Sequence, residues 1–237
     1  MLTASCCLAT EADKIAPMVM ESLPSLDRST LRERALDALR AAITGGQYRP
    51  GDHLGEVEIA GHLGVSRGTV REALRHLQQE GLVVAGARGM LRVSTLSESQ
   101  VRELFQVRAA LEGLAVRLLI AAPKRDAAVA TLRAAVSDLD DTHRNFVAHV
   151  DADMAFHLLL CELSGNSMLV TSWRQLAGRI RVTIMAKGEE QATLMSGSYH
   201  APIVDAIEAG DVAKAVTVLQ EHMERAAERL AGPAAGA

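Results

Sequence analysis

The sequence is poor in aromatic residues, which make up only 3% of its 237 residues although 49% of them are hydrophobic. Sandwiches and barrels of β-strands are rich in aromatic and β-branched residues. Here much of the apolar content is alanine and leucine, which favour helices. The composition therefore predicts a mainly α fold.

Cysteines and long apolar runs are also scarce. The three cysteines are Cys6, Cys7 and Cys161, and adjacent cysteines rarely pair, so we expect no disulfide framework and a reducing, cytoplasmic location. The longest apolar stretch, residues 114–122, contains Arg117 and is too short to span a bilayer. The sequence thus predicts no membrane partner.

Charge is unevenly distributed along the chain. The net charge is −4, but residues 28–95 contain 10 basic and 7 acidic residues. Residues 1–27 and 96–237 are both net acidic. A local excess of positive charge indicates contact with nucleic acid in that segment.

The most informative stretch is residues 64–84, GVSRGTVREALRHLQQEGLVV. Ser66 can cap a helix that Gly81 ends. Apolar residues follow at i, i+3, i+4 and i+7, namely Val70, Ala73, Leu74 and Leu77. The opposite face carries Arg67, Thr69, Arg71 and Arg75. Arginines at the start and middle of a helix match a recognition helix that meets phosphates and base edges, although Arg75 is equally consistent with a solvated charge.

The surrounding pattern predicts helices over residues 29–43, 57–63 and 66–80, then strands over 82–84 and 90–93. Leu31 begins the apolar stripe of the first helix, and Val57 and Leu63 are available to the core from the second. Three helices followed by a hairpin are the order of a winged helix-turn-helix. Arg88 at the hairpin tip could enter the minor groove of DNA.

This segment resembles the GntR family of bacterial transcription regulators. The resemblance rests on ITGG at 43–46, YRPGDHL at 48–54, IAGHLGVSR at 59–67, VREAL at 70–74, EGLV at 80–83 and RG at 88–89. It implies DNA contacts by Ser66, Arg67, Thr69, Arg71 and Gly89. Two positions depart from the family: Gly68 replaces a usual Thr or Pro, and Val57 replaces an arginine that contacts DNA in some members. The operator sequence cannot be inferred from them.

Three domains or segments follow from these patterns: a flexible tail over 1–26, the winged domain over 27–95 and a second domain over 96–237. A single domain of charge +3 would bind DNA weakly. We therefore expect a homodimer on a pseudo-palindromic operator in double-stranded DNA.

The second domain shows only helical patterns. Ser97 and Gln100 have the spacing of a capping box. An apolar stripe that includes Leu114 marks a first helix ending before Pro123. Further helices are predicted over residues 127–139, 146–163, 168–186, 198–209 and 211–230. Six helices without a strand predict an all-α bundle.

Four residues of this bundle form a metal-ligating pattern. Asp153 and His157 are four residues apart, so both face the same way on one helix. His200 and His222 lie at similar distances on either side of the Gly210 turn, so antiparallel helices bring them level. One carboxylate and three imidazoles suit a divalent transition metal such as Zn, Ni, Mn or Fe, with positions open for another ligand.

Residues 97–237 resemble the FCD ligand-binding domain of the FadR subgroup, in its six-helix, VanR-like form. The matching pieces are RAALE at 108–112, DMAFH at 153–157, SGN at 164–166, His200 with IEAGD at 207–211, and His222. The resemblance implies that the Asp and three His bind a metal and that a small carboxylate effector completes its shell. Arg108 is the candidate for holding that carboxylate, and an intrahelical pair with Glu112 is the equal alternative. His149 is either a pocket neighbour or a surface residue.

The sequence as a whole predicts a DNA-binding transcription regulator, most simply a repressor, whose operator binding responds to an organic acid at the metal site. Two alternatives stay open. An Asp/His₃ site could activate water in a metalloenzyme, although no His-Glu-x-x-His motif is present. The metal ion itself could instead be the signal.

Overall fold

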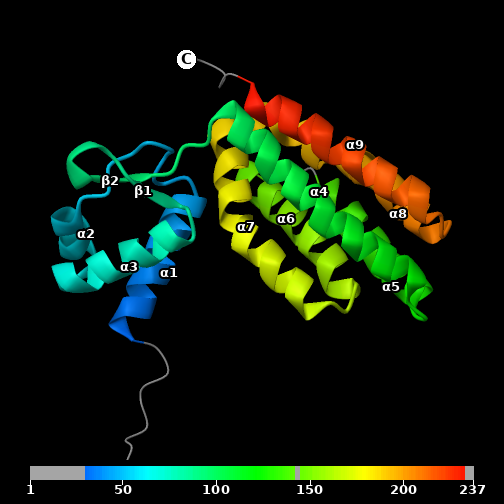
Figure 1. The fold of residues 1–237 in the computed structure, drawn as a ribbon, viewed down its shortest axis with the longest axis horizontal. Helices are drawn as coiled ribbons and strands as arrows, with labels where there is room; N and C mark the ends of the chain where they lie inside the picture. Colours follow the sequence, from blue (N-terminus) through cyan, green and yellow to red (C-terminus); the bar gives the residue numbers. More distant parts are fainter. Residues whose placement is uncertain (1–29, 142–144, 233–237) are drawn as a thin grey trace, which may run out of the picture.

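The computed structural model describes residues 30–141 and 145–232, apart from the side chain of Arg88. Figure 1 shows a small N-terminal body beside a long helical bundle, connected by one short segment. The predicted tail over 1–26 lies outside the described residues. The mainly α class, with a winged helix-turn-helix and a helical bundle, is confirmed. In the described part of the chain no helix is long and apolar enough to cross a membrane.

The N-terminal body contains three helices and a hairpin. They are α1 (Leu31–Thr44), α2 (Glu56–Leu63), α3 (Arg67–Gln79), β1 (Val83–Ala85) and β2 (Leu91–Val93). The strands are antiparallel, with Val84 opposite Arg92. A short 3₁₀ helix, η2 (Ala87–Gly89), forms the hairpin tip, which the sequence did not predict.

The position of α3 follows directly from its sequence. Gly64 adopts a left-handed conformation with φ of 65°, which ends α2 and turns the chain. Ser66 then accepts a hydrogen bond from the backbone N–H of Thr69 at 3.1 Å, as the capping prediction required. The four apolar residues of α3 are buried in the core of this body, so the arginine-bearing face is directed outward.

Three residues expected in this core are instead exposed. Leu31, Val57 and Leu63 expose 60%, 67% and 37% of their surface. Leu31 is the first residue of α1 and lies beyond the packed part of the helix. Because α2 has only 8 residues, its contact with the core is limited to its middle, at Ile59 and Ala60.

The bundle contains all six helices that the sequence predicted, with ends shifted by one or two residues. They are α4 (Glu98–Ala121), α5 (Arg125–Leu139), α6 (Phe146–Leu163), α7 (Ser167–Lys187), α8 (Gly197–Glu208) and α9 (Val212–Ala231). The capping box of Ser97 and Gln100 starts α4. A 3₁₀ helix, η3 (Glu189–Met195), connects α7 to α8 and has no apolar period from which it could be predicted.

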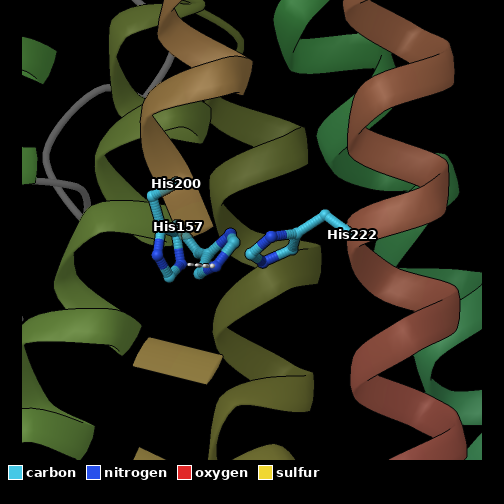
Figure 2. A group of neighbouring side chains, drawn as sticks. All are labelled: His157, His200 and His222. Atoms are coloured by element: carbon cyan, nitrogen blue, oxygen red, sulfur yellow. Dashed lines mark hydrogen bonds between the residues drawn. The ribbon is translucent and has the colours of Figure 1, made fainter. Parts of the chain in front are cut away.

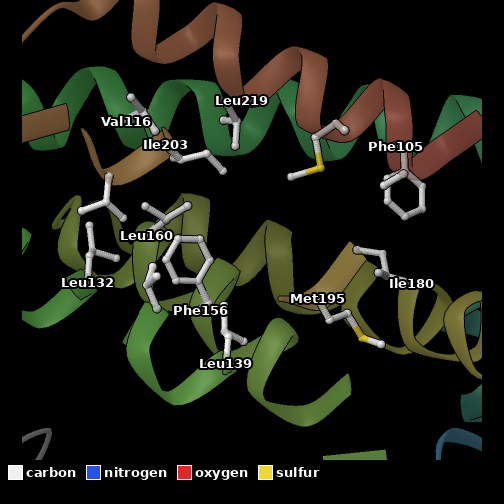
Figure 3. Close-up of a cluster of buried hydrophobic side chains, with 14 of the residues drawn as sticks. Phe105, Val116, Leu132, Leu139, Phe156, Leu160, Ile180, Met195, Ile203 and Leu219 are labelled. Atoms are coloured by element: carbon white, nitrogen blue, oxygen red, sulfur yellow. The ribbon is translucent and has the colours of Figure 1, made fainter. Parts of the chain in front are cut away.

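The bundle core consists of aliphatic side chains and two phenylalanines, and it extends along the helices (Figure 3). Phe156 of α6 lies at its centre, near Leu160 of the same helix. The tight turn at Gly210, with φ of 71°, places α8 and α9 side by side. Leu114 of α4, which was expected in the core, is 44% exposed because it lies on the outer face of α4.

A core substitution in α3 tests the packing of the N-terminal body. Leu74→Ala should lower the free energy of unfolding by about 2–5 kcal/mol, because it leaves a cavity at a fully buried position. The same change at Leu31, which is 60% exposed, should cost at most about 0.5 kcal/mol. Urea unfolding followed by circular dichroism measures both. Equal urea midpoints for the two variants would contradict the burial of Leu74 in the core of the N-terminal body.

Candidate nucleic-acid interface and metal centre

The outer face of α3 carries the arginines that the sequence singled out. Arg67, Arg71 and Arg75 are exposed, and Thr69 is half-buried beside the Ser66 cap. Arg71 forms a bidentate salt bridge with Glu56 of α2, with nitrogen–oxygen distances of 2.7 to 3.1 Å. That hydrogen bond, opposed by partial burial, lowers the pKa of Glu56. Glu56 therefore occupies the guanidinium of Arg71 in the absence of DNA.

Two other candidate contacts are Arg75, on the same helix, and Gly89 of the hairpin. Arg75 pairs with Glu72 on its own helix at 2.6 Å, in accordance with the solvated alternative. Gly89 ends η2 with φ of 75° and is exposed at the hairpin tip. The side chain of Arg88 lies outside the described residues, so its predicted entry into the minor groove stays a prediction.

The bundle brings together three histidines that are far apart in sequence (Figure 2). His157 comes from α6, His200 from α8 and His222 from α9. Each offers a ring nitrogen, and these three atoms all lie within 4.8 Å of one another. All three side chains are at least 97% buried. Such an arrangement could hold a metal ion.

Their hydrogen bonds determine which nitrogens face inward. Nδ1 of His157 donates to Oε2 of Glu112 at 2.6 Å, and Nδ1 of His200 donates to the backbone oxygen of Ser196 at 2.9 Å. Each Nε2 therefore carries a lone pair, and the two Nε2 atoms face each other at 3.1 Å. Two lone pairs at this distance repel unless a cation or proton lies between them.

Asp153 places a carboxylate beside the facing nitrogens of His157 and His200. Its Oδ1 lies 3.1 Å from Nε2 of His200 and 3.8 Å from Nε2 of His157. Burial raises the pKa of Asp153, but the close contact with His200 and the positive charge of Arg108 outweigh it and leave the pKa lowered. The carboxylate is thus ionised at neutral pH, and the donor set of imidazole and carboxylate fits a divalent transition metal.

The imidazoles are in the state that binds metals. Burial, followed by the charge of Arg108, lowers the pKa of His157 well below its ordinary value. Burial and the neighbouring His200 do the same to the pKa of His222. Both rings are therefore neutral at pH 7, with a free lone pair available. Nδ1 of His222 has no hydrogen-bond partner, which leaves it free to coordinate.

Arg108 adopts the alternative geometry that the sequence had left open. Its Nε donates to Oε1 of Glu112 at 2.8 Å, and its side chain is 3% exposed. Its Nη2, however, has no partner. Arg108 lines a small cavity of about 20 Å³ together with Asp153, His157 and His222, a volume close to that of one water molecule.

Two residues of this site were not predicted from the sequence to be functional. Glu112 was considered only as a partner for Arg108, yet it also accepts from His157 and from Trp173. Gln191 reaches the cavity from η3, and its Oε1 has no partner. His149 is half-buried on α6 and does not line the cavity.

Comparison with known families matches both halves of the chain. Residues 31–93 match the model for bacterial regulatory proteins of the gntR family, and residues 103–225 match the FCD domain. A probable D-xylose utilization operon transcriptional repressor of Paenarthrobacter nicotinovorans is 32% identical over 204 residues. That alignment covers 84% of this chain and 88% of the relative.

Solved structures share the fold. A GntR transcriptional regulator from Rhodococcus sp. RHA1 superimposes with a TM-score of 0.70 at 25% identity, covering 85% of this chain and 98% of the other. E. coli McbR/YncC gives a TM-score of 0.67 at 21% identity, covering 85% and 97%. The second likeness establishes the fold alone.

The histidine cluster predicts metal-dependent stability. After treatment with a chelator, adding Zn²⁺ or Ni²⁺ should raise the thermal midpoint, because a ligand at a hundredfold excess over its Kd stabilises the native state by about 2.7 kcal/mol. Differential scanning fluorimetry measures the shift. His222→Gln should lose most of it, whereas His62→Gln, at an exposed histidine, should retain it. A shift of equal size in both variants would show that the metal binds elsewhere.

Proposed function

The chain belongs to the GntR family of bacterial regulatory proteins, and we propose that it is a repressor controlled by a small organic acid bound at a metal ion in its FCD domain. Its relatives are DNA-binding transcription regulators, and the chain is a regulator rather than an enzyme. Because its target is bacterial DNA, it acts in the cytoplasm. The relative from Paenarthrobacter, named as a repressor, supports repression.

The DNA-binding half of the proposal rests on α3. Its exposed arginines, Arg67 and Arg71, project from the first half of a well-packed helix, where a recognition helix meets the major groove. Ser66, Thr69 and Gly89 are further contacts, and Arg75 adds positive charge to the same face. Glu56 competes with DNA for Arg71, so binding involves the loss of one exposed ion pair.

A homodimer doubles the number of DNA contacts that this weakly charged body can make. Helix α4 offers an apolar surface at which two copies could associate. Val107 and Leu114 are 49% and 44% exposed and lie seven residues apart, which is two turns on one face. Half-buried Leu111 and Leu118 extend the same stripe. Covering this apolar surface with a second copy favours association, and two recognition helices then contact the half-sites of a pseudo-palindromic operator.

The metal site consists of His157, His200, His222 and Asp153. An ion there, Zn, Ni, Mn or Fe by the chemistry of these ligands, would supply positive charge and open coordination positions for an anionic ligand. The residues themselves supply the neutral imidazoles of His157 and His222, an ionised carboxylate and buried side chains around the site. The convergence of ring nitrogens from His157, His200 and His222 within 4.8 Å of one another is the main support for placing a cation here.

The unpartnered Nη2 of Arg108 is the observation that carries the effector proposal. A buried guanidinium N–H without an acceptor is energetically costly, and Arg108 lines the cavity beside three of the proposed metal ligands. A carboxylate bound to the metal would accept from it. Because the cavity holds only about 20 Å³, an organic acid must displace part of its lining, and η3 contributes Gln191, Leu194 and Met195 to that lining.

The effector proposal predicts that operator binding depends on a small acid. Fluorescence anisotropy on the DNA fragment upstream of its own gene, with zinc-loaded protein and a panel of small mono- and dicarboxylates, should identify an acid that lowers affinity at least about tenfold, a coupling of about 1.4 kcal/mol. Arg108→Lys should bind DNA normally and lose the response. A response to metal alone, with no acid having an effect, would instead support a metal sensor.

Loss of an arginine from α3 should weaken DNA binding in a salt-dependent way. Arg67→Ala is expected to reduce affinity for the same fragment and to lower the slope of log K against log salt by about 1, as one phosphate contact is lost. Arg102→Ala, at an exposed arginine of α4, is the matched control and should change neither quantity. An unaltered slope for Arg67→Ala would exclude this face from the interface.

A further inference from the structure

We propose that Glu112 positions the metal ligand His157, and that Trp173 transmits the state of this site along α7 to the DNA-binding body. The proposal rests on the metal site described above. It assigns to two buried residues, neither of which binds the metal, the task of coupling the two halves of the protein.

Glu112 is a fully buried carboxylate held by three donors. Its Oε2 accepts from Nδ1 of His157 at 2.6 Å. Its Oε1 accepts from Nε of Arg108 and from Nε1 of Trp173, each at 2.8 Å. A carboxylate behind a metal-binding histidine fixes its tautomer and the direction of its free nitrogen. Glu112 therefore directs Nε2 of His157 toward His200 and Asp153.

The two oxygens of Glu112 connect different helices. One oxygen holds a proposed metal ligand on α6, and the other holds Trp173 on α7. Because a carboxylate is a rigid planar group, any rotation of His157 that moves one oxygen also displaces the other. Trp173 is only 1% exposed and packed against Cys161 and Ala115, so its ring moves together with its helix rather than independently.

The other part of α7 is packed into the DNA-binding body. Val182 belongs to the hydrophobic core of that body. At Gly178, a Cβ atom would lie 3.1 Å from Cδ2 of Leu82, which is tighter than an ordinary contact, so the backbone of α7 lies close against Leu82. Gly178 is five residues beyond Trp173, about 7.5 Å along the helix. A shift of α7 at Trp173 therefore reaches Leu82, the residue before β1.

A second contact connects α7 both to the DNA-binding body and to α6. Arg181 of α7 donates from Nε to the backbone oxygen of Thr44, the last residue of α1, at 2.8 Å. Its Nη1 pairs with Asp151 of α6, two residues before Asp153. Helix α6, which carries two proposed metal ligands, is thus linked through α7 to α1. The geometry assigns the coupling between the metal site and the DNA-binding body to α7, and not only to the short segment between β2 and α4.

Trp173 is the only tryptophan in the chain, so its fluorescence reports on the proposed link. Titration of metal-free full-length protein with Zn²⁺, which is not paramagnetic, should change the emission of Trp173 in parallel with binding. Glu112→Gln should weaken Zn²⁺ binding by about 10- to 100-fold and reduce the emission change at saturation. Glu162→Gln is the matched control, since Glu162 pairs with Arg174 of α7 at the surface, and should match the wild type.

The coupling itself is measured as the ratio of Zn²⁺ affinities with and without the upstream DNA fragment, determined by competition with a chromophoric chelator. Binding linkage requires that this ratio equal the effect of Zn²⁺ on DNA affinity. We expect a ratio different from one for the wild type and near one for Trp173→Phe.

The outcomes separate this inference from the proposed function. If Zn²⁺ does not bind at all, the metal site itself is wrong. If Zn²⁺ binds but the wild-type ratio is one, or if Trp173→Phe keeps the wild-type ratio, the coupling path is overturned and the metal site stands. A Glu112→Gln variant with unchanged Zn²⁺ affinity would remove the positioning role of Glu112.

Discussion

The charge buried at Glu112 is the constraint around which the bundle is arranged. A carboxylate without access to water must be surrounded by donors, and here the donors come from three helices: Arg108 on α4, His157 on α6 and Trp173 on α7. Satisfying that one group fixes the relative position of these helices, and it also presents His157 to the other histidines. Packing and ligand geometry are therefore determined together.

The same constraint explains why the two halves of the chain can communicate. Helix α7 contributes Trp173 to the polar network of the bundle and Val182 to the apolar core of the DNA-binding body. Because close-packed interiors transmit small displacements, one rigid helix with both contacts is a short mechanical path. The apolar face of α3 packs into the same core as Val182, which links the orientation of the arginines on its outer face to α7.

Periodicity and capping signals were sufficient to predict nearly all of the fold, since Ser66, Ser97 and Gly210 act within a turn of their own position. The predictions that failed concerned which residues of a helix are buried against other parts of the protein. Leu31, Val57 and Leu114 have the right spacing for burial, but their exposure depends on where each helix ends or which face is covered. The 3₁₀ helices η2 and η3 have too few residues to produce a period.

The sequence by itself determined the helices, the basic face of α3 and the residue types of the candidate metal site, because these depend on local spacing and on Asp153 and His157 sharing one helix. Only the tertiary structure decided that Nε2 of His157 faces Nε2 of His200, that Glu112 serves three donors at once and that Gln191 reaches the cavity. Those contacts join residues separated by tens of positions, and their geometry exists only once several helices have packed against one another.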